Sequence, residues 1–402
     1  MIHILSQPPN DEFTLRLFFN LLKDLDIRQI KYDAFYAWSM ELIQGRKIIQ
    51  HFNKEDYAYS EEYLDTYSWL DFKFYWNFIL ENSKENLIVI GIKDNLNVGN
   101  FNPWYNTEPD LVTDLKKVFH KLKNKKIILI SSLINLENYI TEKNVKVICW
   151  GGDITNQHTE YSKNYISSQK NLDSKYSFLF LNRGMRPQRL HTLSYIFYKN
   201  LEKFGILTCM FQKELNHDRF NDTEWQFSKE DHDIFKIGQN KLAKHKFEIS
   251  DDPIIYTAKP NDNYTNLIKK LKYYYQDTFI EIIPETLFSE QTILITEKTH
   301  HCILEMCFPI WISSPGTVHY LRKKGLDVFD DIIDHSYDLI EHPIGRIKAA
   351  IDLNINLLND INLTKSLWTK NKIRLSNNVK FIQTKFYDLI TDDAKTKFRS
   401  LL

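Results

Sequence analysis

Three arginines stand close together in the run LNRGMRPQR, residues 181–189. Arg183, Arg186 and Arg189 follow an apolar stretch and precede a helical pattern, so they fall at a turn between a strand and a helix. Guanidinium groups bind phosphate oxygens through paired N–H donors, and helix N-termini attract anions. We therefore predict an anion site at this turn, with a solvated basic loop as the alternative.

A second group combines carboxylates with a lysine. Glu285 follows the apolar run 278–283, and Thr296, Glu297 and Lys298 open a helix predicted over 296–306. A carboxylate at the end of a strand suits the hydroxyls of a ribose or a sugar. A lysine in a first helical turn opposes the helix dipole, which favours an anion bound beside it. The alternative is an ordinary capped helix with exposed charges.

A third run, SSPGT at 313–317, lies between the strand predicted over 308–312 and a helix over 317–323. Ser314 and Gly316 are small enough to let a nucleotide approach a hydroxyl and backbone N–H groups. A tight turn without a ligand explains the same run equally well.

Two further patterns bear on catalysis. Asp153, with His158 nearby, follows the strand predicted over 145–150 and is a candidate general base, with a capping or turn aspartate as the alternative. Asp231 and Asp233 have the spacing of a metal-binding pair. They lie in a charged, helical stretch and not at the end of a strand, so we predict no metal site and no cofactor.

The elements that position these residues are apolar, β-branched runs that alternate with helical patterns. This alternation is typical of an α/β fold. The first domain is predicted over 1–160, with strands at 2–5, 87–90, 126–131 and 145–150. A polar linker follows at 161–175. The second domain covers 176–337, with strands at 176–181, 206–211, 278–283 and 308–312. Helices over 338–402 are expected to brace the two domains.

Composition excludes several classes of protein. The 402 residues carry 52 Lys and Arg against 52 Asp and Glu, and a net charge of zero argues against binding nucleic acid through bulk charge. The chain has only 11 glycines, which argues against a glycine-rich loop that binds phosphate. The four scattered cysteines predict free thiols in a reducing compartment. The chain shows no signal peptide and no apolar run of about 18 residues, so we expect a soluble, cytoplasmic protein.

The segment around the second and third groups resembles a known family of enzymes. The run ILITEKTHHCILEMCFPIWISSPGT (residues 293–317) is similar to the donor-binding domain of fucosyltransferase-like enzymes with the GT-B fold. The segment 284–338 looks closer still to little-characterised bacterial and phage glycosyltransferase-like proteins, in which an Asn-Arg-x-x-Arg-Pro turn accompanies this stretch. His300, His301, Met306 and Cys307 depart from the usual pattern.

This resemblance implies two Rossmann-like domains that face a cleft and bind a nucleotide-diphosphate sugar. Arg183 and Lys298 would act on the leaving diphosphate. The donor would be held by a larger set: Arg183, Arg186, Arg189, Glu285, Thr296, Glu297, Lys298, Ser314 and Gly316. The partners would be the nucleotide sugar and a glycan or glycolipid acceptor of surface polysaccharide, through which alone the protein would touch a membrane. Two alternatives remain: a non-catalytic carbohydrate- or nucleotide-binding protein, and a sugar-phosphate transferase.

Overall fold

The computed structural model describes the following residues: 2–6, 32–37, 49–51, 87–92, 116, 119–120, 122–131, 133–149, 162–182, 186–209, 228–245, 247, 271–286, 288 and 292–400. The chain forms two compact units. Unit 1 contains residues 1–100, 107–153 and 390–402, and unit 2 contains 101–106 and 154–389. The protein is mixed α/β and its sheets are largely parallel.

Unit 1 is built on a six-stranded sheet of order β3-β2-β1-β4-β5-β6. Its strands are β1 (Ile2–Ser6), β2 (Tyr32–Ala37), β3 (Ile49–His51), β4 (Leu87–Ile92), β5 (Lys126–Ser131) and β6 (Val145–Cys149). Every pair is parallel except β2 with β3. This is the strand order of doubly wound nucleotide-binding sheets, with an antiparallel edge. The four strands predicted here are confirmed, whereas β2 and β3 were not predicted.

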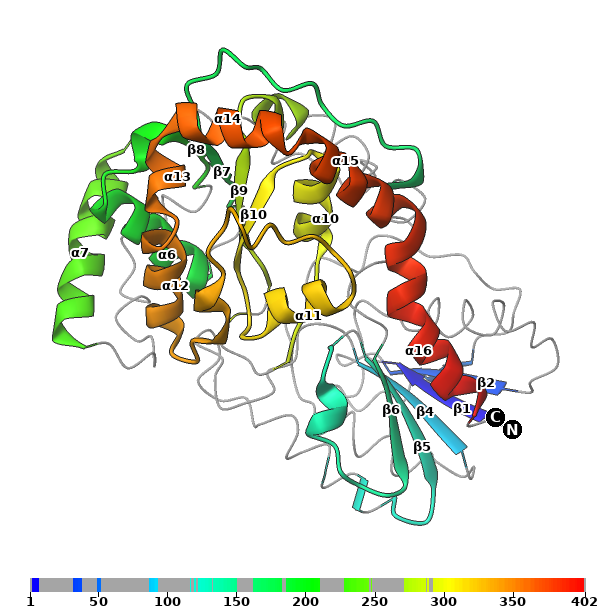
Figure 1. The fold of residues 1–402 in the computed structure, drawn as a ribbon. Coiled ribbons are helices and arrows are strands. Elements are labelled where there is room, and N and C mark those ends of the chain that lie inside the picture. Colours follow the sequence, from blue (N-terminus) through cyan, green and yellow to red (C-terminus); the bar gives the residue numbers. More distant parts are fainter. Residues whose placement is uncertain are drawn as a thin grey trace. The chain divides into compact units, whose positions relative to one another are not determined.

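Unit 2 contains a four-stranded, wholly parallel sheet of order β10-β9-β7-β8. Its strands are β7 (Phe178–Phe180), β8 (Gly205–Leu207), β9 (Ile280–Pro284) and β10 (Phe308–Ile312). The helices of this sheet are α6 (Pro187–Tyr198), α7 (Lys229–Lys244), α10 (Glu297–Leu304), α11 (Thr317–Lys323) and α12 (Pro343–Asp352). Figure 1 shows α6 and α12 on one side of the strands and α10 on the other.

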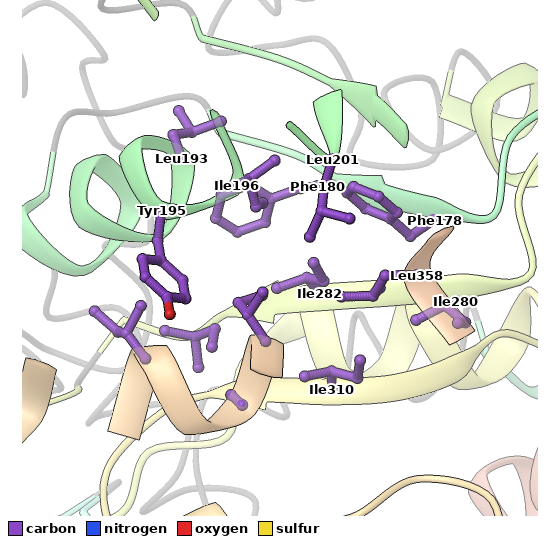
Figure 2. Packing of buried hydrophobic residues seen from close by; sticks show 14 of the residues in the cluster. Phe178, Phe180, Leu193, Tyr195, Ile196, Leu201, Ile280, Ile282, Ile310 and Leu358 are labelled. Atoms are coloured by element: carbon purple, nitrogen blue, oxygen red, sulfur yellow. The ribbon is translucent and has the colours of Figure 1, made fainter. Parts of the chain in front are cut away.

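Apolar side chains from the sheet and from α6 form the core of unit 2. Phe178 and Phe180 of β7, Ile282 of β9 and Ile310 of β10 are all fully buried. Figure 2 shows these side chains facing Ile196 and its neighbours on α6. Strands buried on both faces read as continuous apolar runs, which is why the sequence located them well.

The C-terminal segment is helical, as predicted, but it is broken into short pieces. These are α13 (Ile355–Asn359), α14 (Ile361–Lys370), α15 (Lys372–Phe381), the π-helix η7 (Ile382–Phe386) and α16 (Tyr387–Arg399). Asp360 ends one helix and caps the next by accepting from the N–H groups of Asn362 and Leu363, at 3.0 Å each. Residues from 390 onward belong to unit 1, where Lys397 pairs with Glu137 at 2.5 Å.

The segment predicted as a linker packs against the sheet of unit 2. The buried ammonium of Lys170 donates to the carbonyls of Tyr275 and Thr278 at 2.6 and 2.7 Å, and to Cys307 Sγ at 3.1 Å. The N–H of Ser168 donates to Glu305 at 2.9 Å. Because these contacts join polar side chains to backbone groups distant in sequence, composition alone gives no sign of them.

Candidate functional site

The order of the strands in unit 2 identifies one edge of the sheet as a place for ligands. The chain passes from β7 to β8 on one side and then returns to place β9 on the other side of β7. In open parallel sheets, ligands bind at the carboxyl ends of the strands where the order reverses in this way. That position lies between the ends of β7 and β9, at residues 181–182, 186–187 and 285–286.

Hydrogen bonds join the two loops at this position. Arg186 Nη1 donates to the carbonyl of Thr286 at 2.8 Å. Gln188 Nε2 donates to the carbonyls of Glu285 and Thr286 at 2.9 and 3.2 Å. Arg186 is also the N-cap residue of α6, and Pro187 fills the first helical position, where its missing N–H costs nothing. The arginine-rich turn and the strand-end glutamate are therefore neighbours in space.

Glu285 is buried completely and its two carboxylate oxygens accept three hydrogen bonds. Oε1 accepts from Thr296 N at 3.2 Å and from Thr299 Oγ1 at 2.6 Å, and Oε2 accepts from Thr296 Oγ1 at 2.5 Å. Thr299 in turn accepts from Trp311 Nε1 of β10 at 2.9 Å. These contacts favour a role for Glu285 in fixing the start of α10 beside β9 and β10.

Lys298 and Glu297 form an ion pair in the first turn of α10. Lys298 Nζ lies 3.0 Å from Glu297 Oε1 and donates to Thr296 Oγ1 at 3.0 Å, and both side chains keep part of their surface exposed. Burial alone would raise the pKa of Glu297. The charge and hydrogen bond of Lys298 and the charge of His301 outweigh burial and hold this pKa far below its usual range. The carboxylate of Glu297 therefore stays ionised at neutral pH.

Arg189 adds a buried cation to the same edge. Burial and the charge of Arg186 lower the pKa of Arg189 to about 10, while the charges of Glu297 and Glu285 act in the opposite direction. The guanidinium therefore remains charged at neutral pH. Arg186, Arg189 and Lys298 are separated by up to 112 positions in sequence, yet the fold gathers them around the ends of β7 and β9.

The small-residue turn after β10 borders the same edge. Gly316 has a φ of 81°, a left-handed conformation that favours glycine, and its N–H donates to Asp338 O at 3.0 Å. The carboxylate of Asp338 accepts from Val318 N and His319 N at 3.1 and 3.0 Å and so caps α11. Ser314 Oγ is buried without a hydrogen-bond partner in the described part of the chain.

Several predicted residues fall elsewhere. Asp153, His158 and Arg183 lie outside the described residues. Asp231 belongs to the first turn of α7, where it accepts from Ser228 Oγ at 2.7 Å and pairs with Lys348 at 2.7 Å. Within the described ranges, His, Cys, Asp and Glu side chains nowhere gather in threes that could hold a metal ion. Across those ranges, too, each helix is too short or too polar to traverse a lipid bilayer.

Sequence analysis missed Gln188, Thr299 and Trp311. Gln188 stands inside the arginine-rich turn, and its place directly after Pro187 was the available signal. Thr296 and Thr299 are three residues apart on one face of a helix, a spacing that allows both to reach one carboxylate. Trp311 gave no signal, because its indole N–H finds Thr299 only through the packing of α10 on the sheet.

Comparison with protein-family models and with curated proteins found no match for this chain.

Proposed function

We propose that this protein is a glycosyltransferase that binds a nucleotide-diphosphate sugar at the carboxyl ends of β7, β9 and β10. The observation that carries the proposal is the joining of Arg186 and Gln188 to the loop at Glu285 and Thr286, at the reversal of strand order. The N-terminus of α6 opens at the same place and offers backbone N–H groups to an anion.

The charges of this edge suit a leaving diphosphate. The basic side chains of Arg186, Arg189 and Lys298 lie at this edge, and positive charge stabilises the negative charge that develops as a sugar–phosphate bond breaks. An ammonium has three donors, and Lys298 uses two of them, toward Thr296 and Glu297. Its third donor can serve a phosphate oxygen. In this proposal the side-chain cations take the role that a metal ion has in other transferases.

Buried polar atoms beside these cations support the same proposal. Asn182 Oδ1, at the end of β7, and Ser314 Oγ, at the end of β10, hold no hydrogen bond in the part of the chain that the structure describes. Native proteins pair nearly all such atoms, and an unpaired one calls for an explanation. A polar ligand at this edge would supply the missing partners.

The remaining parts of the proposal follow from the resemblance in sequence. Arg183 would contact the diphosphate with Arg186. Asp153 would act as the base if the reaction inverts configuration. The acceptor would be a glycan or glycolipid of surface polysaccharide.

The test is calorimetric titration with uridine, guanosine, cytidine and adenosine mono- and diphosphates, with and without Mg²⁺. We expect one nucleoside diphosphate to bind without metal. Lys298→Ala should weaken this binding at least tenfold, which corresponds to about 1.4 kcal/mol, the strength of one charge-assisted hydrogen bond. Lys348→Ala is the matched control, because Lys348 is a similarly half-buried lysine paired with a carboxylate, on α12.

Release of a nucleoside diphosphate from the sugar donor on turnover would establish transfer, whereas release of a monophosphate would indicate a sugar-phosphate transferase. Binding without turnover would favour the non-catalytic alternative. If no nucleotide binds, or if both lysine variants lose binding equally, the proposed site is wrong.

A further inference from the structure

One arginine outside the candidate site donates hydrogen bonds to backbone carbonyls of several loops. Arg346 of α12 is 1% exposed. Its Nε donates to Ser313 O at 3.0 Å, its Nη1 to the carbonyls of Ile340 and, at 3.1 Å, Glu341, and its Nη2 to the carbonyl of Phe288. The guanidinium carbon also lies 4.4 Å from the centre of the Phe288 ring. Four carbonyls and one ring therefore surround a single buried cation.

Two of these carbonyls belong to loops of the candidate site. Ser313 directly follows β10 and begins the turn that contains Ser314 and Gly316. Phe288 lies in the loop that leaves β9 through Glu285 and Thr286. One guanidinium thus connects the loop after β9 with the loop after β10, across the edge where the cations gather.

A second residue on the same stretch of chain, Asp338, forms hydrogen bonds with the turn after β10. Asp338 accepts from Gly316 N through its carbonyl and from Val318 N and His319 N through its carboxylate. The charge of Arg346 is close enough to act on that carboxylate. Asp338 and Arg346 therefore hold the turn from two sides, and both come from the segment that runs through η6 (Ser336–Leu339) into α12.

The geometry of a guanidinium suits this task. Its five N–H donors lie in one plane and point in different directions, so that it can bond carbonyls of separate segments simultaneously. An ammonium offers three donors from a single nitrogen and cannot reach the same set. The flat face of the guanidinium also stacks on an aromatic ring, as it does here on Phe288.

We propose that Arg346 is the positioning residue of the candidate site, which fixes the loops after β9 and β10 relative to each other so that Ser314 and the start of α10 face one ligand. It acts through Ser313 and Phe288 and does not itself contact the ligand. The ligand part of this inference rests on the proposed function; the ordering of the two loops does not.

The test compares Arg346→Lys with Arg374→Lys in the full chain. Arg374 is a matched control: it also stacks on a phenylalanine, at 4.9 Å from the Phe329 ring, and binds several acceptors, but these are side-chain oxygens of Asp327, Asp331 and Asn371. Amide hydrogen exchange is followed without ligand in the loops after β9 and β10 and in the core strands, at a temperature well below unfolding of both variants.

We expect exchange at Thr286, Phe288 and Ser314 to be about tenfold faster in Arg346→Lys, the effect of losing one or two hydrogen bonds. Exchange in β7 and β9 should not change, and Arg374→Lys should leave both loops as in the wild type. The affinity for the nucleotide found by titration should fall about tenfold in Arg346→Lys only. A simple loss of stability would instead speed exchange in the core strands as well.

Equal loop exchange in wild type and Arg346→Lys would overturn the inference. If Arg346→Lys does not fold, Phe288→Leu replaces it, because this variant removes the stacked ring and keeps every guanidinium hydrogen bond; the same loops should then exchange faster. If the wild type binds no nucleotide, the proposed function fails, and the exchange measurement still decides whether Arg346 orders the loops.

Discussion

Glu285→Ala should destabilise the protein strongly, because the carboxylate is a buried anchor of α10. The substitution leaves Thr296 N, Thr296 Oγ1 and Thr299 Oγ1 without the acceptor that now lies 2.5 to 3.2 Å away. Hydrogen bonds to a charged group contribute about 1.5–3 kcal/mol each. The substitution also removes the unfavourable desolvation of the carboxylate, which offsets part of this sum. We therefore expect a net loss of about 3–5 kcal/mol in the free energy of unfolding, typical of breaking a buried charged network.

The assay is urea unfolding, with thermal unfolding as a second measure. For a unit of this size, the expected loss lowers the midpoint of thermal unfolding by about 10 °C. Glu285→Gln keeps the size and one carbonyl, so it should lose roughly half as much. The matched control is Glu297→Ala, which removes a partly exposed carboxylate with one ion-pair partner from the same helical turn and should therefore cost less than Glu285→Ala.

The two glutamates give opposite patterns if this argument is correct. Glu285→Ala loses stability first and nucleotide binding as a consequence, whereas Glu297→Ala loses less stability than Glu285→Ala. A Glu285→Ala protein that is as stable as the wild type and fails only to bind nucleotide would refute the argument. Glu285 would then contact the ligand directly, as the sequence alone predicts.

Burial raises the pKa of Glu281 from 4.5 to about 8. The folded state thus keeps a proton that the unfolded chain releases, so stability should fall as pH rises between about 4.5 and 8. In Glu281→Gln, the midpoint of thermal unfolding should fall less over this pH range. Part of the fall should remain, because burial also raises the pKa of Glu305 to about 8. Gly238→Ala places a Cβ 1.9 Å from Ser194 O, where α6 and α7 touch, and should cost about 1–3 kcal/mol in urea unfolding. Gly345→Ala, whose nearest neighbour is a side chain at 3.3 Å, should be nearly neutral. Asp360→Ala removes the cap of α14 and should cost about 1 kcal/mol by the same measurement.

The strands of unit 2 were the most predictable part of the chain. β9 and β10 are buried along their whole length, so selection for apolar, β-branched residues is continuous and visible. The strand predicted at 206–211 corresponds to β8, which ends at Leu207; Thr208 and Cys209 lie outside it, and residues 210 and 211 lie outside the described residues. In unit 1, β2 (YDAFYA) contains Tyr and Phe, which favour strands, but Asp33 and two alanines interrupt the apolar pattern.

The residues of the candidate site also differ in how well the sequence predicted them. The sequence predicted Arg186 at a turn between a strand and a helix, Glu285 at the end of a strand and Lys298 in the first turn of a helix, and these local positions are the ones found. It did not locate Arg346, whose role depends on four carbonyls from three loops. Every residue type has the same backbone carbonyl. A pattern of side chains therefore cannot predict which carbonyls will bind one cation.

The sequence by itself determined eight of the ten described strands and the starts of α6, α10 and α11, because burial and capping act over a few neighbouring positions. Only the tertiary structure decided which strand ends meet. The placement of β9 beside β7, and not beside β8, brings Arg186 to Thr286 across 100 positions. It also decided that Glu285 lies beneath the first turn of α10. Pairing between distant strands depends on how whole faces pack, and that information is spread over the entire unit.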